Sequence, residues 1–258
     1  MKSLIVNADD FGFTRDVNQG IVEAHRNGIL TATTLMATGE AFDDAVRLAR
    51  ETPTLDIGCH LVLVGSPPFP STVARLIRAV VLRRINIYEE LSLQVRRILD
   101  AGITPSHLDT HKHTHLLPPV LDAVTRISEE FKIPWVRKPF DFRAQPGGIG
   151  WKNQLMQLRR WAFARAFLRH SCRSTDWFTG FRITGAYDAK ILAELIRALP
   201  EGSTELMCHP GILGQELQHA RTRLKRSRQD ELTALTSLEV RDAISQTGVR
   251  LARYADLR

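Results

Sequence analysis

Short runs of hydrophobic and β-branched residues alternate along the chain with longer segments in which apolar positions recur at helical spacing. The short runs predict strands at 3–8, 31–37, 56–64, 106–110, 135–138, 177–181 and 204–208. The longer segments predict helices at 16–27, 42–51, 76–101, 118–131, 153–169, 189–199 and 229–247. Every predicted strand is followed by a predicted helix, which gives about seven β/α units in succession.

This alternation predicts an α/β fold with a parallel sheet and crossover helices. One continuous series over residues 1–258, with no linker or repeat dividing it, favours a single domain with a β/α barrel-like fold. A distorted or incomplete TIM-type barrel is included in this prediction. An open, doubly wound sheet is the alternative, although no G-x-G-x-x-G sequence follows the first strand to support a dinucleotide fold. Segments 64–70 and 145–150 predict long loops after strands.

Composition and charge indicate the cellular compartment of the protein and the class of its partner. Its three cysteines are widely spaced, which argues against a disulfide framework and fits a reducing cytoplasm. We find neither a secretory signal nor an apolar stretch of transmembrane length, and we expect a cytoplasmic protein. The formal charge of +7 favours an anionic partner, but zinc-finger and RRM motifs are absent, so we expect no nucleic acid. The excess of basic residues is concentrated at 152–173 and 221–228. These segments form either solvated surface or a functional patch.

Residues able to carry chemistry gather at the ends of the predicted strands. The first strand ends in Asp9 and Asp10, the third contains His60, the fifth ends near Arg137 and the last ends at His209. Because the carboxyl ends of the strands of a β/α barrel meet around one mouth, these distant residues are expected to share one site.

The sequence HLDTHKHTH at 107–115 is the strongest local signal. Alternation along a strand places His107, Asp109 and His111 on one face. Mixed histidine and carboxylate sets are typical of divalent-metal sites and suit Zn²⁺. A hydrogen-bonded polar network without a metal is the alternative.

Two other histidines carry less information by themselves. Taken alone, His60 is more typical of a satisfied core histidine, and His209, which precedes a proline, is equally a candidate for a turn residue. Their neighbours Cys59 and Cys208 should point away from them and be buried structural thiols.

The pair Asp9 and Asp10 requires an explanation, because adjacent residues in a strand point to opposite faces. One carboxylate suits a metal ion, and the other suits a general base that takes a proton from water. An Asx-type turn leading into the next helix is the structural alternative. If both carboxylates serve one ion, the strand must end, bend or bulge at 8–10.

Four ordered motifs resemble those of the YdjC-like carbohydrate deacetylases: NADDFG at 7–12, GCHL at 58–61, HLDTHKHTH at 107–115 and MCHP at 207–210. The resemblance covers nearly the whole chain. It implies a β/α-barrel-like fold, one divalent metal ion, Zn²⁺ or Mg²⁺, and hydrolysis of the N-acetyl group of a sugar.

Carried over by position, the resemblance implies metal ligands at Asp10, His60 and His111. It implies a general base at Asp9 and a general acid or substrate contact at His209.

Substrate contacts are predicted at Arg137, His113 and His115. Arg137 is expected to orient Asp9 or the substrate, and a surface arginine is the alternative.

Two rival functions remain open. A phosphoesterase would need a second metal, for which Asp109, His113 and His115 are available. A non-catalytic metal- or sugar-binding protein would not need Asp9.

Within the family, HLVLVGSPP at 60–68 and the helix rich in tryptophan and arginine are most similar to the hopanoid biosynthesis-associated branch, HpnK. That branch implies an N-acetylglucosaminyl hopanoid, N-acetylglucosaminyl bacteriohopanetetrol, as substrate. A soluble oligosaccharide such as chitobiose is the alternative. Apolar and cationic residues mixed along the helix predict peripheral contact with an anionic inner membrane, unless they simply pack: Trp151, Leu155, Leu158, Trp161, Phe163, Phe167 and Leu168.

Overall fold

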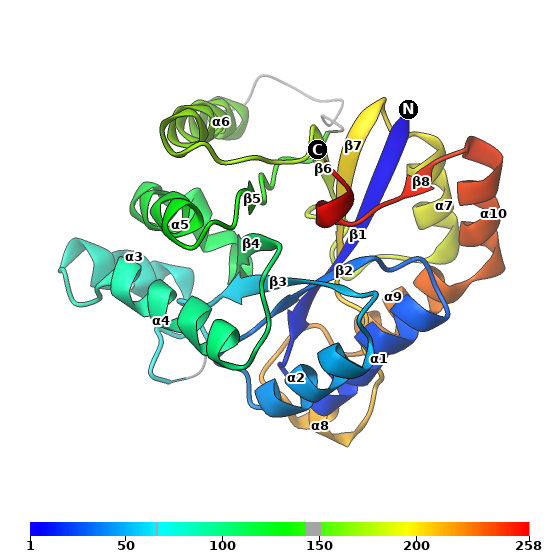
Figure 1. Cartoon of the computed structure of the whole chain (residues 1–258), viewed down its shortest axis with the longest axis horizontal. Helices are drawn as coiled ribbons and strands as arrows, with labels where there is room; N and C mark the ends of the chain where they lie inside the picture. The colour runs from blue at the N-terminus through cyan, green and yellow to red at the C-terminus, as the bar shows by residue number, and fades with distance from the viewer. Residues whose placement is uncertain (66, 143–150, 258) are drawn as a thin grey trace.

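Parallel strands form the centre of the structure, a computed structural model that describes residues 1–65, 67–142 and 151–257. Their order is β5-β4-β3-β2-β1-β7-β6, and β8 pairs separately with β1 (Figure 1). The strands are β1 (Lys2–Phe11), β2 (Ala32–Leu35), β3 (Asp56–Leu61), β4 (His107–Thr110), β5 (Trp135–Val136), β6 (Trp177–Thr179), β7 (Gly202–Cys208) and β8 (Arg250–Leu251).

Helices surround the sheet on its outer side (Figure 1). They are α1 (Arg15–Arg26), α2 (Phe42–Glu51), α3 (Val73–Val81), α4 (Ile87–Asp100), α5 (Pro118–Glu130), α6 (Trp151–His170), α7 (Ala189–Arg197), α8 (Gln215–His219), α9 (Arg226–Thr236) and α10 (Leu238–Thr247), with 3-10 turns η1 (His111–Leu116) and η2 (Tyr254–Asp256). No helix in the described part of the chain is long and apolar enough to cross a membrane.

The predicted fold class is confirmed as a distorted, incomplete barrel. The edge strands β5 and β6 do not pair with each other along their length, and single bridges link their neighbourhoods, Trp135 with Arg173 and Asp141 with Phe178. The half-barrel therefore keeps the seven β/α units expected from the sequence but is not closed by pairing between its edge strands.

Two predicted helices are wrong in extent, because each is two helices. Helix 76–101 is α3 and α4, and Asn86 between them caps α4 by accepting a hydrogen bond from the backbone of Glu89. Helix 229–247 is α9 and α10, and Ser237 caps α10 in the same way. Helix α8 and strand β8 were not predicted, and the predicted loop at 145–150 lies outside the described residues.

The two faces of the sheet differ in chemistry. On β1, Leu4, Val6 and Ala8 pack into the main hydrophobic core. The alternate position Asn7 faces the inside of the half-barrel, where its side chain accepts a hydrogen bond from His107 Nε2 at 2.9 Å. Tyr254 of η2 stacks on the same histidine with ring centres 3.9 Å apart. The interior thus combines a small apolar cluster around Ile5 and Ala32 with a network of buried polar groups, which leads toward the polar residues at the strand ends.

The predicted irregularity at 8–10 is present. The register of β1 against β2 shifts between Ala8 and Phe11, as in a bulge. Asp10 has a φ of 71°, the left-handed region that costs a non-glycine residue about 1–3 kcal/mol. This strained residue is one of the two carboxylates for which the irregularity was predicted.

Candidate active site

Three ligand-type atoms meet at the carboxyl end of the sheet. Asp10 Oδ1 lies 3.1 Å from His111 Nδ1 and 3.4 Å from His60 Nε2, and the two histidine nitrogens are 3.3 Å apart. Ligands bound tetrahedrally to Zn²⁺ at about 2.0–2.1 Å lie about 3.3 Å from one another. The three residues expected to hold a metal therefore form a triangle, termed here the ligand triangle, whose size fits one divalent ion.

The bulge in β1 brings Asp10 into this triangle. In a regular strand Asp10 would face away from Asp9, toward the outer helices. Its left-handed conformation instead turns the carboxylate toward His60 and His111, while Asp9 stays with the buried polar network. The left-handed conformation of Asp10 is therefore what places its carboxylate in the ligand triangle.

His60 is oriented by Asp109, which the sequence offered as a candidate metal ligand and not as a partner of His60. Asp109 Oδ1 lies 2.6 Å from His60 Nδ1, so this nitrogen donates to the carboxylate and Nε2 faces the ligand triangle. Carboxylates commonly fix metal-ligating histidines in this way. Burial lowers the pKa of His60, but the nearby carboxylates, Asp109 foremost, raise it to about 10 on balance. A metal ion at Nε2 would therefore compete with a proton for this nitrogen.

Arg137 lies at the centre of the buried network and is only 1% exposed, so the surface alternative is wrong. Its guanidinium donates to both oxygens of Asp9, at 2.7 and 2.8 Å, and to Glu205 at 2.7 Å, and it pairs with Asp109. Burial raises the pKa of Asp9, but the charge and hydrogen bonds of Arg137, together with the charges of His60 and His209, outweigh burial and hold the pKa below its ordinary value. Asp9 is therefore ionised at neutral pH.

His209 directly follows β7, and its side chain lies near Asp9. Its Nε2 lies 3.9 Å from Asp9 Oδ2, and its backbone N–H donates to the Glu231 carboxylate of α9. Its Nδ1 is buried without a hydrogen-bond partner among the described residues. Burial lowers the pKa of His209 to about 4, although Asp9 and Asp10 oppose the shift, so the imidazole is neutral at pH 7.

The two histidines predicted to contact substrate lie deeper. His115 is fully buried, with Nδ1 bonded to the Thr110 hydroxyl and Nε2 3.1 Å from the Arg137 carbonyl, so neither ring nitrogen is available to a ligand. His113 is 6% exposed, its Nδ1 has no partner among the residues described, and its ring packs edge-on to Phe181 at 4.7 Å. The geometry leaves only His113 of this pair able to reach a ligand.

Because His115 is buried and neutral, acid should destabilise the protein through it. Burial lowers the pKa of His115 to about 3, so between that value and about 6.5 the unfolded chain binds a proton that the native state does not. From pH 7 to pH 5 this residue should reduce the free energy of unfolding by about 2 kcal/mol. Because burial also lowers the pKa values of His107 and His113, both proteins should lose stability over this range, but urea unfolding at both pH values should show a loss smaller by about 2 kcal/mol in His115→Gln than in the wild type; equal losses in the two proteins would contradict the assignment.

Other expectations meet mixed outcomes. Cys59 and Cys208 are buried, as predicted for structural thiols. A second candidate ligand group, Asp9, His60 and Asp109, surrounds positions already taken by Arg137, because its guanidinium bonds both carboxylates. A cation among them would have to displace that buried guanidinium, so the geometry favours one ion over the two of a phosphoesterase.

Sequence reasoning missed two contributions from α9. Arg228, counted in the basic segment 221–228, is 1% exposed, and its guanidinium donates to Asp10 Oδ2. Glu231, one turn further, accepts the backbone N–H groups of His209 and Gly185. Nothing in the local sequence marks these two among the surrounding charged residues, because their role depends on how α9 packs against α1 and α7.

Comparison with known proteins places the chain in a family. A family model described as YdjC-like protein matches residues 3–246. The chain belongs to the YdjC-like family. Two curated relatives are each 34% identical to it: a carbohydrate deacetylase of Brevibacillus brevis, over 98% of this chain and 99% of the relative, and a chitooligosaccharide deacetylase of Salmonella typhimurium, over 98% of both.

Solved structures support the fold of this YdjC-like chain. A putative cellobiose-phosphate cleavage protein from Enterococcus faecalis superposes with a TM-score of 0.77 at 28% identity, covering 98% of each chain. A family 4 carbohydrate esterase from Streptomyces lividans, in complex with acetate, superposes with a TM-score of 0.51 at 10% identity, over 98% of this chain and 92% of the other. The latter likeness concerns the fold alone.

Proposed function

We propose that this YdjC-like chain is a metal-dependent hydrolase that removes the N-acetyl group from an N-acetylglucosamine-type sugar and releases acetate. The observation that carries the proposal is the ligand triangle next to an ionised Asp9. The names of the two curated relatives, a carbohydrate deacetylase and a chitooligosaccharide deacetylase, support the choice of substrate.

The residues divide the hydrolysis between them. A divalent ion held by Asp10, His60 and His111 would polarise the acetyl carbonyl and lower the pKa of water. Asp9 accepts a proton from the attacking water as general base, and its two hydrogen bonds to Arg137 fix its orientation. Arg137 is therefore a positioning residue rather than a substrate contact. Cleavage of the C–N bond then yields acetate and a free amine.

His209 is the candidate general acid, since an amine leaves only after its nitrogen is protonated. It begins neutral at pH 7 and lies 3.9 Å from Asp9. The proton that Asp9 takes from water can thus pass to His209 Nε2 and then to the leaving nitrogen. One proton serves both steps, and both residues return to their starting states.

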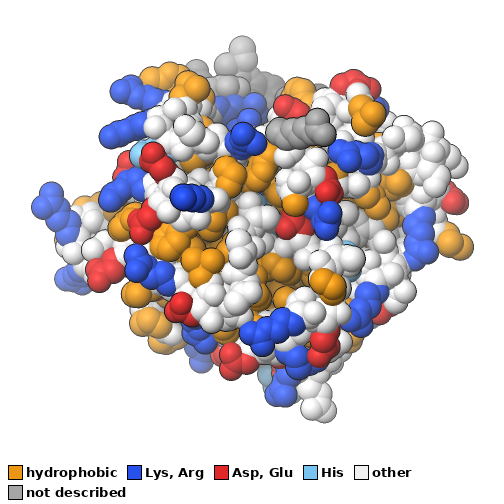
Figure 2. Space-filling model, viewed as in Figure 1, with side chains coloured by type: hydrophobic (Ala, Val, Ile, Leu, Met, Phe, Trp, Pro, Cys, Tyr) orange, Lys and Arg blue, Asp and Glu red, His pale blue; other side chains and the backbone are white. Residues whose placement is uncertain are grey.

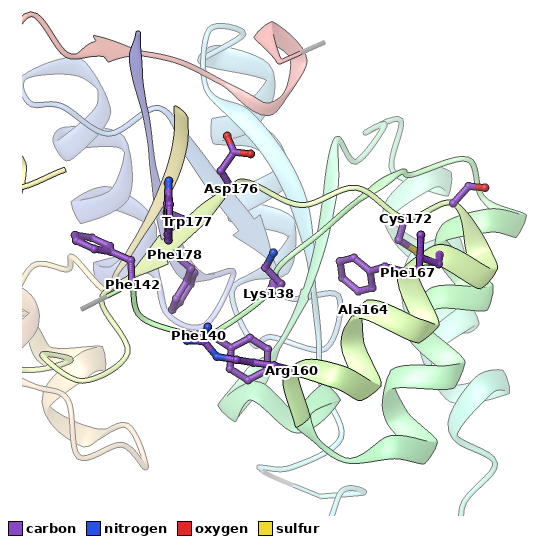
Figure 3. A pocket seen from close by; sticks show the side chains of 12 residues that line it. Lys138, Phe140, Phe142, Arg160, Ala164, Phe167, Cys172, Asp176, Trp177 and Phe178 are labelled. Atoms are coloured by element: carbon purple, nitrogen blue, oxygen red, sulfur yellow. The ribbon is translucent and has the colours of Figure 1, made fainter. Parts of the chain in front are cut away.

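The finer proposal is that the sugar is carried on a lipid, with an N-acetylglucosaminyl hopanoid as substrate. A cavity of about 720 Å³ lies beneath α6, and aromatic side chains line it, among them Phe140, Phe142, Phe167 and Trp177 (Figure 3). Phe178 borders this cavity and is also 6.2 Å from the His113 ring and 5.6 Å from the Arg137 guanidinium. An apolar group could therefore lie next to the site that holds the sugar.

The outer face of α6 supports peripheral membrane contact. Leu158, Trp161 and Leu168 are 65%, 62% and 85% exposed, and they share one stripe with Arg165, which stacks on Trp161. Figure 2 shows hydrophobic and basic side chains side by side over this helix. Exposed apolar and cationic groups together suit a surface of anionic lipid.

Acetate release tests the function. The protein supplied with Zn²⁺ should release acetate from chitobiose and, with a higher kcat/KM, from an N-acetylglucosaminyl hopanoid dispersed in detergent. Higher kcat/KM for chitobiose would instead favour the soluble oligosaccharide. Metal binding without acetate release from any N-acetylated sugar would favour a non-catalytic binding protein.

Vesicle binding tests the membrane contact separately. The full chain should sediment with vesicles containing phosphatidylglycerol, and the double variant Trp161→Ser, Leu168→Ser should lose most of that binding. Leu238→Ser is the matched control, because Leu238 is 74% exposed on α10, which Figure 1 shows on the opposite side of the molecule. Equal sedimentation of all three proteins would exclude α6 as the contact.

A further inference from the structure

Helix α9 brings a buried cation against one of the candidate metal ligands. Arg228 is 1% exposed, its Nη2 donates to Asp10 Oδ2, and its Nε donates to the Leu224 carbonyl at 3.3 Å. Its Nη1 is buried without a partner in the described part of the chain. Among those residues, Asp10 is therefore the one carboxylate to which this guanidinium is hydrogen-bonded.

The two oxygens of Asp10 consequently have different surroundings. Oδ1 faces His60 and His111 within the ligand triangle, whereas Oδ2 is held by Arg228. A carboxylate can bind a metal through one oxygen or through both, and binding through both uses a coordination position that substrate or water could occupy. An oxygen hydrogen-bonded to a guanidinium is turned away from that second role.

We propose that Arg228 is a positioning residue that restricts Asp10 to one-oxygen ligation and so keeps a coordination position open for the substrate. The inference rests on the metal site of the proposed function. It assigns a role in the reaction to a residue of the basic segment 221–228, for which charge alone left solvated surface and a functional patch as alternatives.

The turn after β7 helps to hold Arg228 in place. The Gly211 N–H donates to the Arg228 carbonyl at 3.1 Å, and a Cβ on Gly211 would lie 3.2 Å from Arg228 Cδ. Gly211 follows His209 by two residues, and Glu231 of α9 accepts the His209 N–H. The same helix thus positions the metal ligand Asp10 and the candidate acid His209.

Substitution of Arg228 by Gln, studied with Co²⁺ as the probe, tests this role. Freed from the guanidinium, Asp10 should bind Co²⁺ through both oxygens, so the visible d–d absorption of the bound ion should weaken as its coordination number rises. Co²⁺ affinity should stay within about threefold of the wild type, while deacetylase kcat falls about 10- to 100-fold, the usual effect of losing a group that orients a metal ligand.

Two further variants serve as a matched control and as a charge-retaining comparison. Arg226→Gln removes the same charge from the same helix, but Arg226 is exposed and pairs only with Asp230 among the described residues, so its spectrum and kcat should match the wild type. Arg228→Lys, which retains a cation able to reach Asp10, should recover part of the d–d intensity even if Arg228→Gln folds poorly.

The outcomes separate this inference from the proposed function. An unchanged Co²⁺ spectrum in Arg228→Gln and Arg228→Lys, or a loss of Co²⁺ binding by more than about tenfold, would overturn the inference and leave the function standing. Failure of the wild type to bind Co²⁺ would overturn both.

Discussion

Replacing His111 by Ala will reduce deacetylase activity by at least about 10³-fold, and chelation of the metal will do the same to the wild type. Electrophilic stabilisation by an ion contributes several kcal/mol, and each 1.36 kcal/mol corresponds to a factor of ten in rate. His111 is the best ligand to remove because its side chain is 23% exposed, whereas His60 and Asp10 are buried, so the fold should tolerate the change. Acetate release and metal content per chain, measured together, provide the test.

His219→Ala is the matched control for this substitution. His219 is exposed on α8, and its ring bonds only the Gln215 carbonyl among the residues described, so this variant should keep its metal and its activity. If His111→Ala retained a full complement of metal and wild-type activity, the ligand triangle would not be the metal site.

Substitution of Asp9 by Asn will lower kcat by about 10²- to 10⁴-fold while the metal stays bound. The amide keeps the shape of the carboxylate but accepts no proton from water, and loss of a general base has an effect of this size. Asp9 lies outside the ligand triangle, so metal content should remain at one ion per chain. Steady-state kinetics with metal analysis of the same preparation will measure both quantities.

Glu205→Gln separates this chemical role from a general effect on Arg137. Glu205 also bonds the Arg137 guanidinium, at 2.7 Å through Nε, and the substitution removes the same charge from the same buried network. Because Glu205 has no contact with the ligand triangle, its variant should lose much less activity than Asp9→Asn. Equal losses in the two variants would assign Asp9 to support of Arg137 instead of to proton transfer.

Much of the fold is predictable because β/α alternation is a local pattern repeated along the chain. Periodicity found the strands β1 to β7, but it missed β8 and joined α3 to α4 and α9 to α10. The signals for those breaks were present as the capping residues Asn86 and Ser237, which apolar positions on both sides obscured. Whether the barrel closes depends on how the edge strands β5 and β6 meet, and that is a property of tertiary packing.

The site was predictable as far as its residues carry their own signals. The adjacency of Asp9 and Asp10 implied an irregular strand, and the bulge is present. Sequence spacing alone left His60 and His209 undecided, because residues 51 positions apart, such as His60 and His111, meet only through the parallel sheet. The resemblance to the family supplied what spacing lacked.

Residues that act through other residues were the hardest to predict. Arg228 was one arginine among several in a basic segment, and its burial against Asp10 follows from the packing of α9 rather than from its neighbours in sequence. Arg137 had an orienting role among its expected functions, but its position between three carboxylates depends on the meeting of β1, β4, β5 and β7 inside the half-barrel.

The central claim is that this chain hydrolyses an N-acetyl amide of a sugar with the help of one metal ion. The most direct measurement is the parallel determination of acetate and free amine formed from chitobiose by protein containing one Zn²⁺ per chain. Amide hydrolysis predicts that both products appear at the same rate and in equal amounts, and that Asp9→Asn forms neither at a comparable rate. Absence of both products from chitobiose and from every other N-acetylated sugar, with the metal bound, would contradict the account.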